Sequence, residues 1–230
     1  MSRPDLLQQT RRYYNGKLAE HGPTARGVDW NSEQSQRLRF RELTRLVEDE
    51  PDASVLDYGC GYGALRTYLR ERGHRGRYVG FDISEQMIDA ARAGASDEAA
   101  RFSAVRETIE PVDYTLASGI FNVKQTASDD EWRRYVLETI EDLAAVSTRG
   151  FAFNALTQYS DPDRRRPDLY YADPLKLFDH CKRHISRFVS LLHDTPLYEF
   201  TLLVRLPASV ADVASAPPVG APARGTRRAT

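Results

Sequence analysis

The 230-residue chain is 41% hydrophobic and 28% charged, proportions typical of one globular α/β domain with short appendages. Its net charge of −1 leaves no surplus of cations to neutralise a phosphate backbone, so we expect no nucleic-acid partner. No apolar run approaches the roughly twenty residues that span a bilayer, and the N-terminus lacks a signal-peptide core, so we expect a cytoplasmic protein without membrane contact. The two cysteines, Cys60 and Cys181, form neither a disulfide framework nor a metal-binding spacing, and no metal site is predicted.

Two helices are predicted ahead of the first strand, in a segment that we assign as an N-terminal helical cap over residues 1–50. Residues 5–20 carry apolar side chains on adjacent helical faces, and the His-Gly-Pro sequence at 21–23 ends this helix. Asn31, with Gln34 three residues later, forms a candidate capping box for the second helix. Both helices precede the first strand.

The most informative stretch of the chain is a glycine-rich turn between a buried strand at 54–56 and a helix. Residues 55–63 read Val-Leu-Asp-Tyr-Gly-Cys-Gly-Tyr-Gly, and a second strand at 77–81 ends in Asp82. Glycines let the backbone turn sharply and approach a ligand where a Cβ would collide. A carboxylate at the end of the second strand can accept two hydrogen bonds from ribose hydroxyls. The segment therefore predicts the front half of a nucleotide-binding βαβ unit.

The residue before the turn decides between candidate nucleotides. Gly59, Gly61 and Ala64 formally satisfy the dinucleotide fingerprint, but Asp57 stands at the mouth of the turn. Its carboxylate would repel a pyrophosphate and favour a ligand that carries a cation there. S-adenosylmethionine carries an ammonium and a sulfonium and no phosphate. An NAD-dependent oxidoreductase stays open as an alternative that predicts affinity for NADH.

The run from Asp57 to Gly63, together with Gly80-Phe81-Asp82-Ile83-Ser84 and Met87, resembles the class I S-adenosylmethionine-dependent methyltransferases, in outline over residues 30–206. The resemblance implies a Rossmann-like fold with S-adenosyl-L-methionine as cofactor, and an N-terminal helical lid that covers the cofactor. It also implies that the first motif holds the methionine part, that Asp82 holds the ribose and that Ile83 lies against the adenine. The expected cofactor-binding residues are Asp57, Gly59, Cys60, Gly61, Asp82, Ile83, Met87, Gly119, Tyr14 and Trp30.

The rest of the chain alternates predicted helices and strands, as a doubly wound sheet requires. The predicted elements are a helix at 85–93, strands at 101–104 and 114–118, a helix at 130–146 capped by Asp129, a strand at 151–156, a helix that begins at Pro174, and strands at 185–193 and 197–206. The last two strands are joined so tightly that they must be antiparallel. We therefore predict an α/β domain over residues 51–207, Rossmann-like and doubly wound, with a mostly parallel sheet and an antiparallel C-terminal hairpin. Residues 208–230, rich in Ala, Pro and Gly, are expected to be a disordered tail.

Candidate acceptor-side residues follow the fourth and fifth strands, because ligands of such sheets bind beyond the carboxyl ends of the strands. Gly119 lets the backbone approach the reacting end of the cofactor, and Phe121 and Asn122 are expected to point into the pocket. Tyr170 and Tyr171 lie in the loop after the fifth strand and complete the set of candidate catalytic residues. The same loop carries three arginines at 164–166, which are expected to be solvated.

Two aromatic residues from the N-terminal segment, Tyr14 and Trp30, could close the pocket from the other side. Aromatic faces attract sulfonium and other soft cations. Methyl transfer from a sulfonium needs positioning and exclusion of water more than proton transfer, so no catalytic triad is required.

The leading hypothesis is a bacterial enzyme that methylates a small molecule in specialised metabolism, with the acceptor atom and the oligomeric state, monomer or homodimer, left open. One alternative is an enzyme that cyclises the cofactor itself and releases methylthioadenosine. Another is a non-catalytic module that binds the cofactor without turnover. The by-product discriminates, because methyl transfer releases adenosylhomocysteine.

Overall fold

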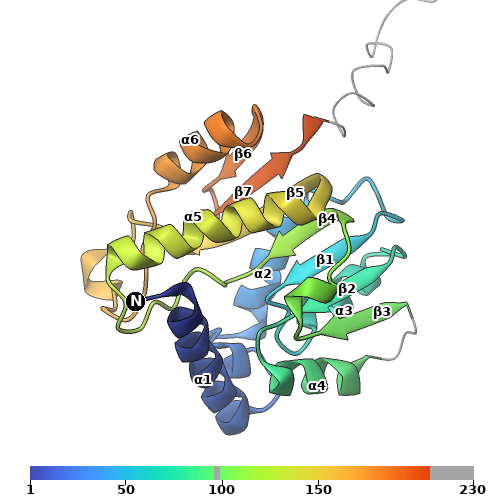
Figure 1. The fold of residues 1–230 in the computed structure, drawn as a ribbon, viewed down its shortest axis with the longest axis horizontal. Coiled ribbons are helices and arrows are strands. Elements are labelled where there is room, and N and C mark those ends of the chain that lie inside the picture. The colour runs from blue at the N-terminus through green and yellow to red at the C-terminus, as the bar shows by residue number, and fades with distance from the viewer. Residues whose placement is uncertain (96–98, 208–230) are drawn as a thin grey trace, which may run out of the picture.

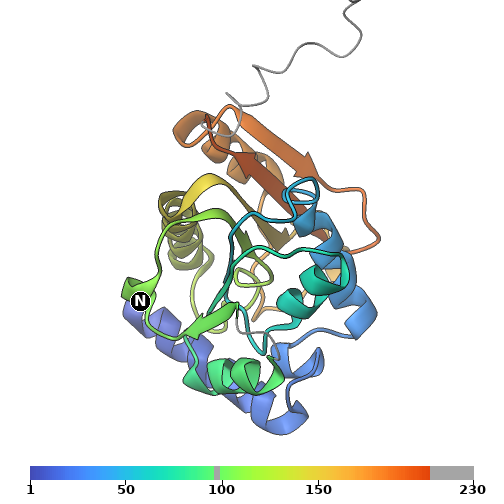
Figure 2. The ribbon, with the colours of Figure 1, turned by 90° about the vertical axis from the view of Figure 1, so that its right-hand side faces the viewer.

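The computed structural model describes residues 1–95 and 99–207, and the tail expected at 208–230 lies outside them. The described residues form a seven-stranded sheet with helices on both faces (Figures 1 and 2). The strands are β1 (Val55–Tyr58), β2 (Tyr78–Phe81), β3 (Ala100–Ser103), β4 (Val112–Ala117), β5 (Ser147–Leu156), β6 (Phe188–Leu192) and β7 (Glu199–Arg205).

The strand order is β3-β2-β1-β4-β5-β7-β6. The first five strands of this order pair in parallel, whereas β7 pairs antiparallel with both β5 and β6. The predicted fold class, a mostly parallel Rossmann-like sheet with an antiparallel C-terminal hairpin, is confirmed. The order reverses between β1 and β4, which is where ligands bind in open α/β sheets.

In the described part of the chain, six α-helices and three short 3₁₀ helices lie before and between the strands. They are α1 (Arg3–His21), η1 (Arg26–Val28), α2 (Glu33–Thr44), α3 (Ala64–Glu71), α4 (Glu85–Gly94), η2 (Arg106–Thr108), α5 (Asp129–Val146), η3 (Pro162–Arg164) and α6 (Pro174–His184). Successive residues of β1 face opposite sides of the sheet, so Val55 and Leu56 enter different hydrophobic clusters. The cluster with Leu56 packs α1, α5 and α6 on one face, and the cluster with Val55 packs α2 and α3 on the other.

The N-terminal segment contributes to the core as well as to the rim of the sheet. Phe40 and Leu43 of α2 are buried in the same cluster as β1 and β4. α1 contributes one buried residue, Leu6, to the cluster with Leu56 and lies beside α4 at the edge of the molecule (Figures 1 and 2). The N-terminal helical lid and the domain boundary at residue 50 stay proposals. Within the described residues, none of the helices combines the length and apolar character that a membrane span needs.

Two helix caps differ by one residue from the prediction. The cap of α2 is Ser32, not Asn31, and its hydroxyl accepts a hydrogen bond from Ser35 N at 3.1 Å. The cap of α5 is Ser128, not Asp129. Its hydroxyl accepts from Glu131 N at 3.3 Å, and the Glu131 carboxylate accepts from Ser128 N at 2.9 Å. Asn, Ser and Asp are all favourable helix caps. Which of two adjacent residues caps the helix depends on which one has extended backbone, and the sequence does not show this.

Replacing Ser128 by alanine should remove this capping box and lower the free energy of unfolding by about 1 kcal/mol. Urea denaturation followed by circular dichroism measures the change. Ser190→Ala, at an exposed position in β6, serves as the control and should change stability by less than ~0.5 kcal/mol. Equal losses in the two variants would show that the cap of α5 does not stabilise the fold.

Candidate functional site

A cavity, called here the first cavity, opens at the carboxyl ends of β1, β2 and β4, where the strand order reverses. It encloses about 830 Å³ of space, its open mouth included. The structure brings together on its lining every residue that the sequence predicts for cofactor binding: Asp57, Gly59, Cys60, Gly61, Asp82, Ile83, Met87, Gly119, Tyr14 and Trp30. The prediction missed several further lining residues, among them Gln36, Tyr62, Ser118 and Tyr135.

The glycine turn after β1 forms the floor of the first cavity. Gly59 and Gly61 adopt φ angles of 83° and 52°, in the left-handed region that favours glycine. A Cβ at Gly59 would lie 2.3 Å from the Ile120 side chain, and one at Gly61 would lie 2.9 Å from Val28. The amides of Gly59 and Cys60 donate to the Phe81 carbonyl at 2.7 and 2.9 Å, which fixes the turn to β2. The turn is thus held in place by hydrogen bonds, and side chains at Gly59 and Gly61 would fill the space that it leaves for a ligand.

Asp57 lies at the end of β1 with only 2% of its surface exposed. Tyr78 donates its hydroxyl hydrogen to the carboxylate at 2.6 Å. Burial raises the pKa of Asp57 to about 7, opposed by the Tyr78 hydrogen bond and reinforced by the charge of Asp82. Since burial is the main cause, a cation bound beside this carboxylate would restore its ionised form. Asp57 is therefore suited to hold an ammonium group.

Asp82 follows β2 and faces the turn. Its two carboxylate oxygens accept hydrogen bonds from Gly61 N and Ser84 N, each at 2.9 Å. Burial raises the pKa of Asp82 to about 6, although these two backbone hydrogen bonds act in the opposite direction. Each oxygen keeps a second lone pair, so the oriented carboxylate can still accept from a pair of hydroxyls such as those of ribose.

Ser118 is a further polar residue at the first cavity. Its side chain lines the cavity directly after β4, and its buried hydroxyl has no hydrogen-bond partner among the described residues. Buried polar groups without a partner are uncommon and call for an explanation, such as a ligand. With two carboxylates and a glycine cradle in the same cavity, the residues present fit S-adenosylmethionine.

The affinity for S-adenosylhomocysteine, which retains the ammonium and the ribose, should depend on pH. Below pH 7 the raised pKa values of Asp57 and Asp82 let both carboxyls take up protons, and the protonated forms lose the ammonium and hydroxyl contacts. We expect affinity to be highest near pH 8 and to fall by about 10- to 100-fold between pH 8 and pH 5. Isothermal titration calorimetry at constant ionic strength measures this. A flat profile would contradict the assignment of both carboxylates.

A second cavity of about 800 Å³, open mouth included, adjoins the first. The two share Tyr14, Val28, Trp30 and Gly119. The second cavity is lined largely by polar and charged side chains, among them Asp29, Asn31, Arg39, Asn122, Ser160, Arg164, Arg166, Tyr171, Tyr198 and Glu199. The arginines at 164–166 are exposed, as expected, but two of the three also line this cavity, which the sequence did not predict.

The structure separates the four candidate catalytic residues into two pairs. Asn122 and Tyr171 line the second cavity. Phe121 and Tyr170 line neither cavity, and the expectation that Phe121 points into the pocket is corrected. Phe121 is fully buried and packs edge-to-face on Phe153 at 5.3 Å, and Tyr170 belongs to the same core cluster. Both pairs lie in loops, and the loop conformation sends one side chain of each pair to the cavity and the other to the core.

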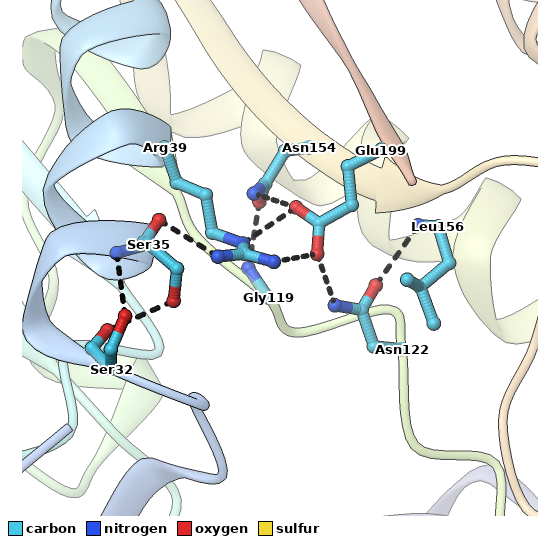
Figure 3. A network of polar contacts seen from close by, with 8 residues as sticks. All are labelled: Ser32, Ser35, Arg39, Gly119, Asn122, Asn154, Leu156 and Glu199. Atoms are coloured by element: carbon cyan, nitrogen blue, oxygen red, sulfur yellow. Dashed lines mark hydrogen bonds and ion pairs between the residues drawn. The ribbon is translucent and has the colours of Figure 1, made fainter. Parts of the chain in front are cut away.

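A polar network that the sequence did not predict forms part of the wall of the second cavity (Figure 3). Arg39 of α2 donates from Nε and Nη2 to the two oxygens of Glu199 in β7, both at 2.8 Å. Glu199 is only 3% exposed and also accepts from Asn154 at 2.7 Å and from Asn122 at 3.4 Å. One signal could have drawn attention to it, since Glu199 opens a strand that is otherwise largely apolar.

Known proteins with related sequences and folds identify the family of this chain. The family model described as "Methyltransferase domain" matches residues 55–142. "Putative methyltransferase Rv1506c" of Mycobacterium tuberculosis (strain ATCC 25618 / H37Rv) is 49% identical over 162 residues, which cover 70% of this chain and 98% of that protein.

Two solved structures show the same fold at low sequence identity. Magnesium protoporphyrin IX methyltransferase from Synechocystis PCC 6803 with bound S-adenosylmethionine has a TM-score of 0.63 at 17% identity, covering 86% of this chain and 96% of its own. Burkholderia thailandensis 1,6-didemethyltoxoflavin-N1-methyltransferase has a TM-score of 0.59 at 19% identity, covering 90% of this chain and 91% of its own. Together with the 49% identical relative, they show that the chain belongs to the class I S-adenosylmethionine-dependent methyltransferases.

Proposed function

We propose that this methyltransferase acts on a small molecule that binds in the second cavity. The observation that carries the proposal is the wall shared by the two cavities, which is formed by Tyr14, Val28, Trp30 and Gly119. An acceptor in the second cavity would thus lie next to the residues that follow β4, where the reacting end of the cofactor is expected. When bound, S-adenosylmethionine supplies an activated methyl group for in-line displacement.

The residues of the first cavity hold and orient the cofactor in this proposal. Asp57 pairs with the ammonium, Asp82 accepts from the ribose hydroxyls, and the glycine turn admits the chain of the cofactor. Burial strongly raises the pKa of Tyr14, so its phenol stays protonated and can donate a hydrogen bond or contribute its ring face. Tyr14 and Trp30 exclude water from the boundary between the two cavities.

Asn122 and Tyr171 bind and orient the acceptor. The Asn122 side chain is held in place because it donates to Glu199 and accepts from Leu156 N at 3.2 Å. The Tyr171 hydroxyl accepts from Arg166 N at 2.9 Å. Both groups are thus fixed by neighbours and are suited to positioning rather than to proton transfer. Their polar character favours an acceptor with hydrogen-bonding groups near the methylated atom.

The second cavity, a hollow lined largely by polar and charged side chains, supports a small-molecule acceptor of the kind found in specialised metabolism. A few polar groups in a pocket fix the orientation of a small molecule, whereas a nucleic acid or a protein surface would need an open, extended groove. The net charge of −1 fits the absence of a nucleic-acid partner. One similar structure is named for methylation of a small heterocycle, 1,6-didemethyltoxoflavin, which it holds bound. We also propose a cytoplasmic location without membrane contact.

Separation of a host extract into a small-molecule filtrate and a macromolecular retentate tests the acceptor class. Each fraction is incubated with the protein and S-adenosylmethionine, and adenosylhomocysteine is quantified by mass spectrometry. We expect adenosylhomocysteine with the filtrate only, accompanied by a metabolite that has gained one methyl group. Adenosylhomocysteine with the retentate only would assign a macromolecular acceptor. Methylthioadenosine formed without either fraction would make the cofactor itself the substrate.

A further inference from the structure

The wall between the two cavities belongs to a closed ring of five residues from both halves of the chain. Gly119 N donates to the side-chain carbonyl of Asn154 at 2.8 Å, and the Asn154 amide donates to Glu199 at 2.7 Å. Glu199 accepts both branches of the Arg39 guanidinium (Figure 3). That guanidinium lies 4.0 Å from the centre of the Trp30 ring.

Trp30 closes the ring onto Gly119. A Cβ built on Gly119 would lie 2.4 Å from Trp30 Cζ2, so the indole rests directly on the glycine backbone. Both residues line the first cavity and the second cavity. The place of the indole therefore sets the shape of both cavities at their shared wall.

The chemistry of the ring points to positioning more than to stability. The Arg39 and Glu199 side chains are only 10% and 3% exposed. Buried ion pairs often contribute little net stability, because removal of two charges from water offsets their attraction. Arg39 is also held at its third nitrogen, which donates to Ser35 O at 2.8 Å. A guanidinium whose three nitrogens all donate hydrogen bonds is held in a fixed plane. One face of this plane stacks on the Trp30 ring.

We propose that Arg39 and Glu199 form a positioning pair that holds Trp30 on the Gly119 backbone and so fixes the wall shared by the first cavity and the second cavity. The pair connects α2 to β7, two elements far apart in the chain, and transmits their relative placement to the site of methyl transfer. The role of the wall in separating cofactor from acceptor rests on the proposed function. The placement of Trp30 by the pair does not.

Acrylamide quenching of tryptophan fluorescence tests the proposal in the ligand-free protein. Trp30 and Trp132 are the two tryptophans of the chain. Trp132 is 1% exposed and donates to Phe121 O at 2.8 Å, so it is shielded from quencher. Subtracting the fluorescence of the Trp30→Phe variant from that of the unaltered protein leaves the emission of Trp30. We expect Arg39→Lys to raise the quenching of Trp30 and to weaken S-adenosylhomocysteine binding by about 2- to 30-fold.

Arg75→Lys is the matched control. Arg75 donates from two nitrogens to Asp52 at 2.9 and 2.7 Å, but this pair is exposed and lines neither cavity. It should leave both the quenching of Trp30 and the affinity unchanged. Equal behaviour of Arg39→Lys and Arg75→Lys would overturn the proposal.

The double variant Arg39→Met/Glu199→Gln covers the case in which a single variant fails to fold. It removes both buried charges and keeps an amide oxygen for Asn154, so its melting temperature should approach that of the unaltered protein. Exposure of Trp30 in this stable variant would support positioning. Trp30 shielded as in the unaltered protein would overturn it. Neither outcome depends on which acceptor is methylated, so failure of the proposed function is recognised separately.

Discussion

Replacement of Asp57 by asparagine should weaken S-adenosylhomocysteine binding by about 10- to 100-fold, because a charged hydrogen-bond acceptor is lost from the ammonium site. The same change should raise the thermal stability of the ligand-free protein at pH 8. Differential scanning calorimetry and isothermal titration calorimetry measure the two effects. A buried charge that binds a ligand lowers the stability of the ligand-free protein and raises its affinity for the ligand. Its removal is therefore expected to change stability and affinity in opposite directions.

The stability gain follows from the raised pKa of Asp57. The folded protein keeps the proton of this carboxyl up to about pH 7, whereas the unfolded chain loses it near the ordinary value of 3.8. Stability therefore falls as pH rises through this interval, and the full penalty, on the order of 4 kcal/mol, is present above pH 7. Asparagine removes the penalty while keeping an oxygen for the Tyr78 hydroxyl. At pH 4, where the folded protein holds Asp57 neutral, the two proteins should melt within a few degrees of each other.

Asp113→Asn provides a control of opposite sign. Burial alone would raise the pKa of Asp113, but hydrogen bonds from the hydroxyl and the amide of Ser54 outweigh it, so the pKa is lowered. This variant should lose stability at pH 8 and bind S-adenosylhomocysteine normally, because Asp113 lines neither cavity. Unchanged affinity in Asp57→Asn would contradict the ammonium site. Unchanged stability at pH 8 would contradict the raised pKa.

Replacement of Gly119 by alanine should produce a large loss of methyl transfer. The residue has φ of 75°, where a side chain costs about 1–2 kcal/mol. Its Cβ would also lie 2.4 Å from the Trp30 ring, which must then move and change the wall of both cavities. We expect the affinity for S-adenosylhomocysteine to fall at least about tenfold because the wall of the first cavity changes. Methyl transfer should fall on the order of 100-fold, since misplacement of about 1 Å near a reacting centre has that cost in rate.

Gly16→Ala is the matched control for this variant. Gly16 lies within α1, and a Cβ there would meet no atom within 4 Å. The substitution should stabilise the helix by about 0.5–1 kcal/mol without effect on binding. Normal binding by Gly119→Ala would show that neither the glycine backbone nor the placement of Trp30 limits the site.

The sheet and the first cavity could be predicted because their physical requirements restrict the residue types. Left-handed backbone at Gly59 and Gly61 restricts those positions to glycine, and the acid at the end of β2 stands at a fixed distance along the chain. Element ends were harder to predict. The strand expected from residue 185 begins at Phe188, because Ile185 and Ser186 donate to Cys181 O and end α6.

The second cavity shows where prediction from the sequence stops. Phe121 and Asn122 are neighbours, and the conformation of the loop after β4 decides which of them reaches the cavity. Arg39 and Glu199 are separated by 160 residues, and each resembles an ordinary surface charge until the fold brings them together. Local patterns carry no information on such a pairing, since it depends on the packing of α2 across the sheet.

The fate of a labelled methyl group tests the central claim most directly. The protein is incubated with S-adenosylmethionine labelled in the methyl carbon and with the small-molecule filtrate of a host extract, and all labelled products are identified by mass spectrometry. The account predicts unlabelled adenosylhomocysteine together with one labelled small molecule, and loss of both products in Asp57→Asn. Label retained in methylthioadenosine, or labelled macromolecules alone, would contradict it.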